Sequence, residues 1–316
     1  MSRSALVIVN YGSSELLARN AARLELPSRC RLVVVDCFSS DAERARVRAL
    51  ADARGWRAVL LEENAGFGGG VNAGANLAIA EGADVVVTLN PDAFLEHDAL
   101  ATLVAAAAAD PAALVVPRIV DSSGRPWFGG ADLYLDDGSI AGASRRDSRA
   151  GRPRREWATG ACLALSADLW RRVGGFDEDY FLYWEDVDLS HRVMDAGGRI
   201  LLADAVATHD EGGTHDDAAS GRAKSETYYY YSIRNRLLYA AKHLDAAGSA
   251  AWLRATPRVS YAILLQGGRR QLVTLPPWRA YVRGIRDGRR LLTARGLPRI
   301  GLPERSEATF DRTGAS

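Results

Sequence analysis

The chain has 316 residues, 47% of them hydrophobic and 25% charged, and a formal net charge of +1 at pH 7. These values are ordinary for a globular protein and exclude the fibrous and intrinsically disordered classes. Its three cysteines show no CxxC spacing, which argues against a disulfide framework or a structural zinc site and favours a reducing compartment. No run of 18 apolar residues occurs, so we expect a cytoplasmic protein without a membrane span.

The charges are unevenly distributed along the chain. Residues 222–299 carry 16 Lys and Arg against 3 Asp and Glu, whereas residues 1–221 carry 22 against 33. An acidic front and a basic C-terminal region indicate two separate surfaces or functional units. No nucleic-acid-binding motif accompanies the basic residues, so we expect no nucleic-acid partner.

The first part of the chain alternates strand-like and helix-like segments. Dense Val, Leu and Ile runs predict strands at 5–10, 31–36, 57–62, 84–90 and 112–117. Helical patterns lie between them, at 13–24, 41–54, 70–81 and 96–109. The strand runs are continuously apolar, as is typical of strands covered on both faces. Repeated strand–helix–strand units predict a mostly parallel, doubly wound α/β sheet, whose ligands bind at the carboxyl ends of its strands.

The pattern changes after residue 117. Residues 121–155 are rich in Gly, Asp, Arg and Ser, which predicts hairpins and, at 136–155, a mobile loop. Further elements are expected as a strand at 159–166, helices at 167–173 and 185–196, a strand at 199–210, and helices from 228 onward. The last residues, 304–316, are predicted to be a disordered tail.

Polar residues follow the ends of the first four predicted strands. They are Asn10 and Tyr11, then Asp36, then residues 62–64, then residues 90–92. In an open parallel sheet these ends meet at one crevice. Asn and Asp also end strands as turn formers, which explains any one of these positions more readily than all four. Asp36 is placed to bind a ribose or a base, and Asp92 to offer oxygen to a divalent metal on a diphosphate.

A glycine-rich stretch, ENAGFGGGVNAG at 63–74, precedes a predicted helix. Its glycines allow close backbone approach, and the helix N-terminus offers N–H groups to an anion. A loose GxGxxA pattern at 68–73 also raises the possibility of a nicotinamide-binding Rossmann domain. That hypothesis is the weaker one, because the loop follows the third strand and not the first.

Three acidic residues, Glu185, Asp186 and Asp188, lie in the block YFLYWEDVDLSHR at 180–192. Acidic residues in the first turn of a helix are favourable with the helix dipole, which is a purely structural explanation. It does not explain the aromatic residues beside them. Aromatic rings next to carboxylates suit sugar stacking and a carboxylate of shifted pKa that acts as a general base.

His209 ends the last predicted strand, shortly before a Gly-Gly pair. This position favours a metal-ligand role over a structural one, with His215 as the competing candidate. His97 and His191 are expected on helix surfaces.

In ordered sequence, several of these segments resemble family 2 glycosyltransferases of the GT-A fold, especially the rhamnosyltransferase-like subgroup. The segments are IVNYGS, VVVDCFSSD, ENAGFGGGVNAG, LNPD, TGACLALSADLWRRVGGFDEDYFLYWEDVDLSHR and THDEGG. The resemblance covers about residues 4–245. It implies a single nucleotide-diphospho-sugar transferase domain followed by a helical extension.

The resemblance also implies site roles. Asp186 matches the catalytic base, with Glu185 beside it, and Asp92 and His209 match the residues that bind Mg²⁺ or Mn²⁺. Nucleotide-sugar contacts are implied for Asn10, Tyr11, Asp36, Asn64, Gly66, Phe67, Gly68, Asn72, Asn90 and Asp92. Contacts with the acceptor or the sugar are expected from Gly160, Tyr183 and Trp184.

Two positions depart from the family pattern. Relatives commonly have Asn after the nucleoside-binding Asp, whereas this chain has Cys37. The metal motif begins with Asn90 in place of Asp, as is usual in the rhamnosyltransferase-like subgroup. A single strong carboxylate then remains, which makes His209 more important to metal binding.

The implied activity is metal-dependent, inverting transfer of a sugar from a nucleotide-diphosphate donor to an acceptor hydroxyl. A dTDP-deoxysugar such as dTDP-L-rhamnose is favoured over a UDP-sugar, and the acceptor is a glycan, a lipid-linked glycan or a natural product. The expected domains are a catalytic domain at 1–221, divided into a nucleotide-sugar half (1–120) and an acceptor half (121–221), and a basic helical region at 222–303. That basic region would contact the inner face of a membrane or a second subunit.

Three alternatives from other classes stay open. A non-catalytic sugar-nucleotide-binding protein would keep the fold without needing Asp186. A nicotinamide-dependent oxidoreductase would need a dinucleotide pocket at the first strand–helix turn, which here reads NYGS. A sugar nucleotidyltransferase would carry a Gly-rich Arg/Lys signature after the first strand, and the sequence has none.

Overall fold

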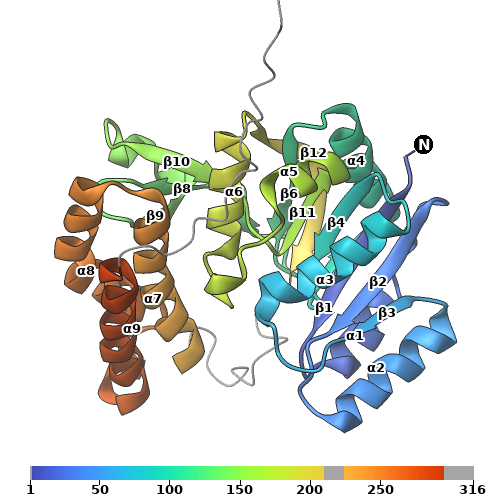
Figure 1. Ribbon diagram of the computed structural model, residues 1–316, viewed down its shortest axis with the longest axis horizontal. Coiled ribbons are helices and arrows are strands. Elements are labelled where there is room, and N and C mark those ends of the chain that lie inside the picture. The colour runs from blue at the N-terminus through green and yellow to red at the C-terminus, as the bar shows by residue number, and fades with distance from the viewer. Residues whose placement is uncertain (1, 210–223, 295–316) are drawn as a thin grey trace, which may run out of the picture.

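The computed structural model describes residues 2–209 and 224–294. Within these ranges a curled nine-stranded sheet lies between layers of helices, and three C-terminal helices pack beside it (Figure 1). The strands of this sheet are β1 (Ser4–Asn10), β2 (Cys30–Asp36), β3 (Arg57–Leu60), β4 (Val85–Leu89), β5 (Ala93–Leu95), β6 (Ala113–Val120), β7 (Pro126–Phe128), β11 (Cys162–Ser166) and β12 (Arg199–His209). The helices that cover it are α1 (Ser14–Ala21), α2 (Asp41–Arg54), α3 (Gly66–Ala80), α4 (His97–Ala109), α5 (Ala167–Val173) and α6 (Glu185–Asp195).

The strand order is β3-β2-β1-β4-β11-β6-β12-β5, with β7 paired to β6. β1 runs parallel to both β2 and β4, and β6 runs parallel to β12, which confirms the mostly parallel α/β sheet. β11 is antiparallel to both of its neighbours, β4 and β6. A strand buried on both faces has the same apolar composition in either direction, so the sequence did not predict this reversal.

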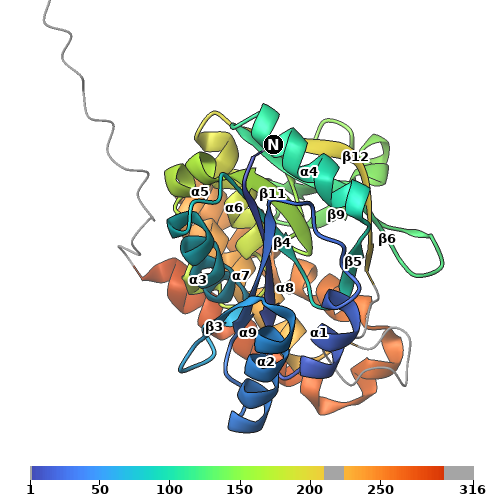
Figure 2. The ribbon, with the colours of Figure 1, turned by 90° about the vertical axis from the view of Figure 1, so that its right-hand side faces the viewer.

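Alternate residues of β1 supply two hydrophobic layers. Leu6 and Ile8 pack in a cluster with residues of α1, α2 and α4, whereas Val7 and Val9 pack with residues of α3, α5 and α6. Figure 2 shows α1 and α4 on one side of the sheet and α3 and α5 on the other. Full burial of one such side chain contributes roughly 1.5–3 kcal/mol. Burial on both faces explains why the strand runs are continuously apolar.

Local signals fix the ends of α2 but not the start of α3. Ser40 Oγ accepts a hydrogen bond from the backbone N–H of Glu43 at 3.2 Å, and Gly55 ends α2 in the left-handed conformation. α3 begins at Gly66, four residues before its predicted start. Its glycines lie inside the helix, on the side that packs closely on the sheet. A side chain would not fit there, since a Cβ on Gly74 would lie 2.6 Å from Val7 Cγ1. The glycine-rich stretch is therefore mainly the start of a helix that packs closely on the sheet.

The hairpins predicted within 121–155 are present as a small sheet of β8 (Ala131–Tyr134), β9 (Ile140–Gly142) and β10 (Arg154–Trp157). In place of a loose loop, the segment between β9 and β10 has two short 3-10 turns held by ion pairs. Arg146 Nε lies 2.8 Å from Asp132 Oδ2, and the guanidinium groups of Arg149 and Arg152 lie over the Tyr134 ring. The prediction of a mobile loop counted apolar anchors and did not consider these charged contacts. The mobility of the segment stays a prediction.

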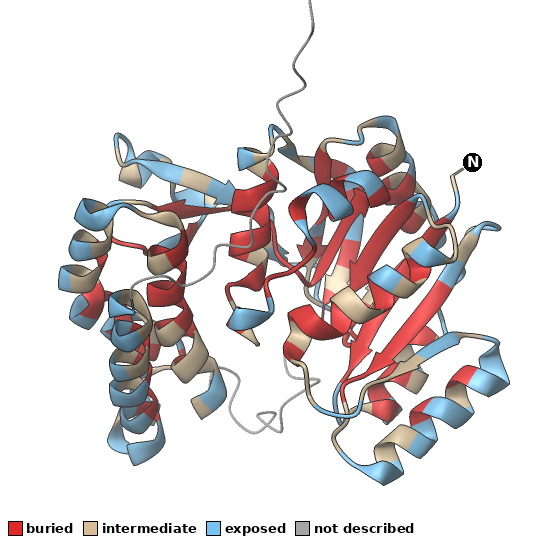
Figure 3. Ribbon diagram, viewed as in Figure 1, coloured by how far each residue is buried: buried red, intermediate tan, exposed pale blue. Residues whose placement is uncertain are grey.

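The C-terminal helices are α7 (Glu226–His243), α8 (Ala246–Gln266) and α9 (Leu275–Thr293), with a short 3-10 segment at Arg269–Val273. α7 packs against the segment that leads into α6, through a buried cluster that includes Tyr180, Trp184, Tyr239 and Trp252. Figure 3 shows this joint as buried, whereas much of the outer side of α8 and α9 is exposed. The predicted helical extension is confirmed.

Two further expectations concern residues that the structure does not describe. The tail at 304–316 and the competing histidine, His215, lie outside the described ranges. Within the described ranges, no helix has both the length and the apolar character needed to cross a bilayer.

Candidate active site

Asn10 and Asp36 lie side by side at the carboxyl ends of β1 and β2. The register pairs the two residues, and Asn10 Nδ2 donates a hydrogen bond to Asp36 Oδ1 at 3.3 Å. Burial raises the pKa of Asp36, and the contacts with Asn10 and Arg44 partly oppose this shift. Asn10 Oδ1 and Asp36 Oδ2 are buried without a hydrogen-bond partner in the described part of the chain. Asp36 Oδ2 lies 3.8 Å from Arg44 Nε, an ion-pair distance, but accepts no hydrogen bond from a described residue. Two buried acceptors without such a hydrogen bond at a strand end are suited to bind N–H or O–H groups of a ligand.

Asp92 and His209 meet because β12 runs antiparallel to β5. The register places His209 opposite Ala93, so the residue before Ala93 lies beside the imidazole. His209 Nε2 lies 3.2 Å from Asp92 Oδ1 and 3.4 Å from Asn90 Nδ2. The His209 ring stacks on Trp127 with 4.6 Å between ring centroids. Residues separated by more than a hundred positions in the chain are thus brought together by one strand pair.

Asp92 and His209 fit two ligands of a divalent cation. Both side chains are buried, and His209 Nδ1 has no hydrogen-bond partner among the described residues. A carboxylate oxygen and an imidazole nitrogen are common metal ligands. The described ranges contain no group of three or more His, Cys, Asp or Glu side chains that could hold a metal ion. Water or a substrate diphosphate would have to complete the coordination.

The turn before α6 has an unusual backbone. Phe181, Tyr183 and Trp184 have φ values of 61°, 63° and 77°, a left-handed region that bulky residues rarely adopt. The turn contacts the start of α3, where the backbone N–H of Phe67 donates to the Phe181 carbonyl at 2.9 Å. A Cβ on Gly66 would lie 2.1 Å from the same carbonyl oxygen, so this contact requires glycine. The glycine-rich segment and the acidic block therefore meet directly.

Asn235 of α7 holds this turn from the other side. Its Nδ2 lies 2.8 Å from the Tyr180 carbonyl oxygen, 2.9 Å from that of Leu182 and 2.7 Å from that of Tyr183. The side chain is fully buried. Asn235 was not predicted from the sequence, where its only signal is a lone amide among the residues of α7 that are buried.

Asp186 lies at the start of α6 and is held by backbone N–H groups. Its Oδ2 accepts from Gly160 at 3.0 Å, and its Oδ1 accepts from Val187 at 2.8 Å. Burial raises the pKa of Asp186 to about 6, although both hydrogen bonds favour the ionised form. The side chain is partly exposed, so a proton donor can approach it. A carboxylate of this kind is suited to general base chemistry.

Glu185 is more deeply buried than Asp186. Burial and the neighbouring charge of Asp186 raise the pKa of Glu185 well above its ordinary value. Its Oε2 has no hydrogen-bond partner among the described residues. Glu185 and Asp186 are therefore in different environments, and of the two only Asp186 accepts a hydrogen bond from the Gly160 N–H.

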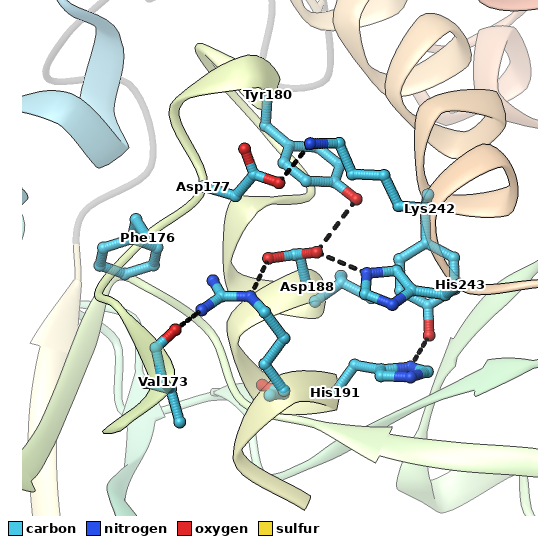
Figure 4. A network of polar contacts seen from close by, with 12 residues as sticks. Val173, Phe176, Asp177, Tyr180, Asp188, His191, Lys242 and His243 are labelled. Carbon is cyan, nitrogen blue, oxygen red and sulfur yellow. Dashed lines mark hydrogen bonds and ion pairs between the residues drawn. The ribbon is translucent and has the colours of Figure 1, made fainter. Parts of the chain in front are cut away.

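Asp188 is part of the joint between α6 and α7 (Figure 4). Its Oδ1 accepts from Tyr180 at 3.2 Å and lies 2.6 Å from His243 Nε2, and its Oδ2 accepts from Arg192 Nε at 2.7 Å. Burial disfavours its charge, but the contacts with His243 and Arg192 lower the pKa of Asp188 below its ordinary value. Asp188 is therefore a buried, paired carboxylate that connects two helices.

His191 corrects another expectation, since it is buried in this joint and not on a helix surface. Its Nδ1 contacts the Tyr239 hydroxyl, and its Nε2 lies 2.9 Å from Asp195 Oδ2. The His191 and His243 rings lie 4.1 Å apart. Burial, with the nearby charge of His243, lowers the pKa of His191 to about 4.

Several expected contact residues have their polar groups occupied within the chain. Asn72 donates to the Phe176 carbonyl at 2.9 Å and accepts from the Phe176 N–H at 2.8 Å, and Asn64 Oδ1 accepts from Gly66. Trp184 is 6% exposed, and its ring packs on Tyr239 and Trp252, so no ring face is open to stack on a sugar. This packing corrects the expectation of a sugar contact from Trp184.

The remaining expected residues lie along one continuous path. Tyr11 is 52% exposed next to Asn10. A Cβ on Gly160 would lie 3.1 Å from Phe67 and 3.5 Å from Asp186 Cβ, so the start of α3 and the start of α6 meet at this glycine. The backbone N–H of Asn90 donates to the Ala161 carbonyl at 2.9 Å, which joins the same glycine segment to the end of β4.

Two further expected residues lie close to this path. A Cβ on Gly68 would lie 3.8 Å from Glu185 Cβ. Tyr183 is partly exposed in the left-handed turn, with its ring edge against Tyr228. The strand-end residues and the acidic block therefore belong to one candidate site.

Comparisons with known proteins agree with this geometry. Residues 6–162 match the family "Glycosyl transferase family 2". The chain is 22% identical over 268 residues to the low-salt glycan biosynthesis hexosyltransferase Agl10 of Haloferax volcanii, covering 82% of this chain and 80% of the relative. It is 37% identical over 82 residues to the N-acetylglucosaminyl-diphospho-decaprenol L-rhamnosyltransferase of Mycobacterium tuberculosis, covering 25% of this chain and 27% of that protein.

The fold resembles a solved glycosyltransferase structure. The crystal structure of GalNAc-T7 with UDP, GalNAc and Mn²⁺ aligns with a TM-score of 0.61 at 15% sequence identity. The alignment covers 92% of this chain and 56% of that one, so the chain spans little more than half of the length of this neighbour. From its family match, its relatives and its sheet, the chain belongs to the family 2 glycosyltransferases of the GT-A fold and is similar to rhamnosyltransferases.

Proposed function

We propose that the chain transfers a sugar, with inversion, from a nucleotide-diphosphate donor to an acceptor hydroxyl, and that Asp186 is the catalytic base. The observation that carries this proposal is the environment of Asp186. Its carboxylate is held by the Gly160 and Val187 N–H groups, it is partly exposed, and its pKa is raised to about 6. A base with a pKa of about 6 is mainly ionised at neutral pH and can still accept a proton.

Asn10 and Asp36 would bind the nucleoside. Asn10 Oδ1 and Asp36 Oδ2 are buried and accept no hydrogen bond from a described residue, so both can accept one from base N–H or ribose O–H groups. The start of α3 lies beside them, since a Cβ on Gly70 would be 2.7 Å from Cys37 Sγ. A helix N-terminus at this place favours the negative charge of a diphosphate. The rhamnosyltransferase relative supports L-rhamnose as the transferred sugar. Its donor would be dTDP-L-rhamnose or another dTDP-deoxysugar, with UDP-sugars as the second choice.

Asp92 and His209 would hold Mg²⁺ or Mn²⁺, with Asn90 beside them. A bound divalent ion neutralises negative charge that develops on a leaving diphosphate. The two side chains are buried and 3.2 Å apart, and the His209 ring is fixed by stacking on Trp127. Their fixed geometry favours a preformed pair over one that assembles around the ion.

The proposed reaction is a single displacement. The acceptor oxygen forms a bond to the anomeric carbon while the bond from that carbon to the diphosphate oxygen breaks. Asp186 takes the proton of the acceptor hydroxyl, because each of its oxygens keeps a lone pair beyond the one that receives a backbone N–H. Glu185, buried next to it, would contribute to the electrostatics of the site and not to proton transfer. The acceptor would be a hydroxyl of a glycan, a lipid-linked glycan or a natural product.

Asp186→Asn tests the base. We expect sugar transfer from dTDP-L-rhamnose or a UDP-sugar to fall by about 10²–10⁴-fold while donor affinity is kept, since the amide cannot accept the proton. Glu185→Gln is the matched control and should retain most of the rate. If Asp186→Asn transferred sugar at the normal rate, Asp186 would not be the base. If neither the original chain nor any variant transferred sugar but the donor still bound, the chain would be a sugar-nucleotide-binding protein.

A second pair of variants tests the metal ligands. Asp92→Asn and His209→Ala should each weaken Mn²⁺-dependent binding of dTDP or UDP, measured by calorimetry, and leave metal-free binding of the nucleoside unchanged. Full Mn²⁺-dependent affinity in either variant would remove that residue from the proposed pair.

A further inference from the structure

The outer side of the C-terminal helices carries a group of exposed apolar side chains, which we call the outer patch. It consists of Tyr261, Leu265, Val273, Leu275, Trp278 and Val282. More than half of the exposed large apolar residues in the described chain belong to it. Val273 is 88% exposed, Leu275 68% and Val282 62%, so these side chains are in solvent and not at the margin of the core. Grouped exposed apolar side chains commonly mark an interaction surface.

The outer patch is continuous across two helices. Tyr261 of α8 stacks on Trp278 of α9 with 6.3 Å between ring centroids. Leu275, Trp278 and Val282 are spaced three and four residues apart and therefore share one side of α9. The other side of α9, with its small buried residues, packs on α7; these residues are Pro277, Ala280, Gly284 and Gly288. α9 is thus packed on one side and apolar and exposed on the other.

Cationic side chains accompany the outer patch. Arg269 and Arg270 lie in the 3-10 segment between α8 and α9, and Arg279 lies next to Trp278. All three are exposed, and none forms an ion pair with any described residue. Arg286 and Arg290, further along α9, differ in this respect because both pair with Asp287. These three arginines, next to the apolar side chains, can therefore pair with anionic groups of another molecule.

We propose that the outer patch docks the protein on the surface of an anionic lipid bilayer. A helix with one apolar, aromatic and basic exposed side lies in the plane of such an interface, with its apolar side chains among the upper acyl chains. Trp278 and Tyr261 are the residue types that prefer the boundary between headgroups and acyl chains. Arg269, Arg270 and Arg279 would bind the lipid phosphates.

Charge favours lipid over a second copy of the chain. In a two-fold dimer the same surface of both chains meets, so the unpaired arginines of one copy would approach those of the other. Like charges brought together destabilise an interface, whereas anionic headgroups neutralise the same arginines. The proposal is independent of the sugar-transfer reaction, because it uses no residue assigned to the candidate active site.

The first test is sedimentation of the full chain with vesicles of equimolar phosphatidylcholine and phosphatidylglycerol, compared with phosphatidylcholine alone. We expect binding to the anionic vesicles at low salt and weaker binding at high salt. The triple variant Arg269→Gln, Arg270→Gln, Arg279→Gln should bind about 100-fold more weakly, from a loss of roughly fivefold per arginine. The matched control removes the same amount of positive charge elsewhere, at three other exposed arginines that form no ion pair with a described residue: Arg48, Arg54 and Arg172. The control should bind as the original chain does.

A second variant tests the apolar part. Val273→Ser, Leu275→Ser and Val282→Ser together change only exposed side chains, so no cavity forms in the core. Binding should fall on the order of tenfold or more at either salt concentration. Circular dichroism of each variant should match that of the original chain.

Three outcomes would overturn the proposal. They are absence of binding to anionic vesicles at low salt, equal binding by the outer-patch variants and their control, and dimerisation that the outer-patch variants abolish. The last outcome, seen by light scattering without vesicles, would make the outer patch a contact between copies. Sugar transfer to a water-soluble acceptor is expected to be the same in all of these variants, so a failure here leaves the proposed reaction standing.

Discussion

Three carboxylates occupy the first turn of α6, and their surroundings give them different chemistry. Asp188 is paired with Arg192 and His243, which lowers its pKa despite burial. Glu185 is buried, one of its oxygens has no hydrogen-bond partner among the described residues, and its pKa is raised. Asp186 lies between these extremes, because two N–H groups offset part of the cost of burial. Their neighbours, and not their order in the sequence, distinguish a structural acid from a candidate base.

The pH dependence of the rate should report on Asp186. Because the base must be ionised, kcat should rise with pH through about 6 and level off above it, and protonation should remove activity below it. The measurement is kcat at saturating donor across this range, with donor affinity by calorimetry at the same pH values. A kcat that stayed constant through pH 6 while donor affinity was unchanged would contradict the assignment.

Asn235 should act as a positioning residue. The cost of holding three bulky residues in the left-handed region is about 1–3 kcal/mol each, and the Asn235 amide holds the carbonyls of that turn. Asn235→Ala should lower kcat more than it weakens donor binding. Asn235→Asp should be worse than alanine, because it places carboxylate oxygens against carbonyl oxygens. Equal kcat in the original chain and Asn235→Ala would show that the turn holds its shape without this amide.

At the scale of elements, α7 is tied to the turn before α6 by buried charge. Lys242 Nζ lies 2.6 Å from Asp177 Oδ2 and 2.6 Å from Asp179 Oδ2, and both Lys242 and Asp177 are buried. Burial of Asp177 raises its pKa in spite of this partner. We therefore expect that removing both Lys242 and Asp177 destabilises the protein less than removing only one of them, because a single removal leaves an unpaired buried charge.

Lys242→Met should destabilise the protein by about 3–5 kcal/mol, because it leaves Asp177 buried without its partner. The double variant Lys242→Met, Asp177→Asn should recover part of this loss. Urea unfolding gives the free energies of unfolding, and Arg283→Met, which removes an exposed pair with Glu226, should change them by less than about 1 kcal/mol. A double variant no more stable than Lys242→Met would mean that charge does not account for the loss.

The elements themselves were largely predictable from the sequence. Helices such as α2 and α5 have the predicted bounds because their caps, Ser40 and Ser166, are local signals. The reversal of β11 was not predictable, because an apolar run carries no direction. The ion pairs that hold the segment around Arg146 and Arg152 depend on the fold that brings Asp132 and Asp136 near them.

The candidate site was predictable only in part, because some of its contacts depend on the tertiary fold and not on local sequence. Residues at strand ends, such as Asn10 and Asp36, follow from the parallel sheet and were expected together. The contact between His209 and Asp92 depends on the antiparallel pairing of β12 and β5, which no local pattern contains. The burial of Trp184 depends on Trp252 in α8, so its aromatic character alone suggested the wrong partner.

At the scale of the whole molecule, the acidic front and the basic C-terminal region meet inside one chain. Arg258 lies 2.8 Å from Asp137, and Lys242 and His243 contact the acids near α6. These contacts suggest that the catalytic domain does not end at residue 221. We propose that it includes α7.

A chain ending at residue 221 tests this boundary. It would expose Tyr180 and Trp184 and leave Asp177 and Asp188 without their partners on α7, so we expect aggregation or loss of near-ultraviolet circular dichroism. A chain ending at residue 294 keeps every described helix and should unfold as the full chain does. If the shorter chain unfolded cooperatively at the same temperature as the full chain, the boundary at 221 would stand.

The neighbouring imidazoles of His191 and His243, whose ring centroids lie 4.1 Å apart, make the attachment of α7 to α6 sensitive to acid. An unfolded His191 binds a proton below about pH 6.5, whereas the folded one does so only near pH 4, so stability is lost as pH falls between these values. Below about pH 4 His191 is protonated in both the folded and the unfolded state, so its contribution to the loss of stability no longer grows. His191→Gln should flatten the dependence of the melting temperature on pH in this interval, and His97→Gln, at an exposed position, should not. Acidification is therefore expected to loosen the C-terminal helices before it reaches the core of the sheet.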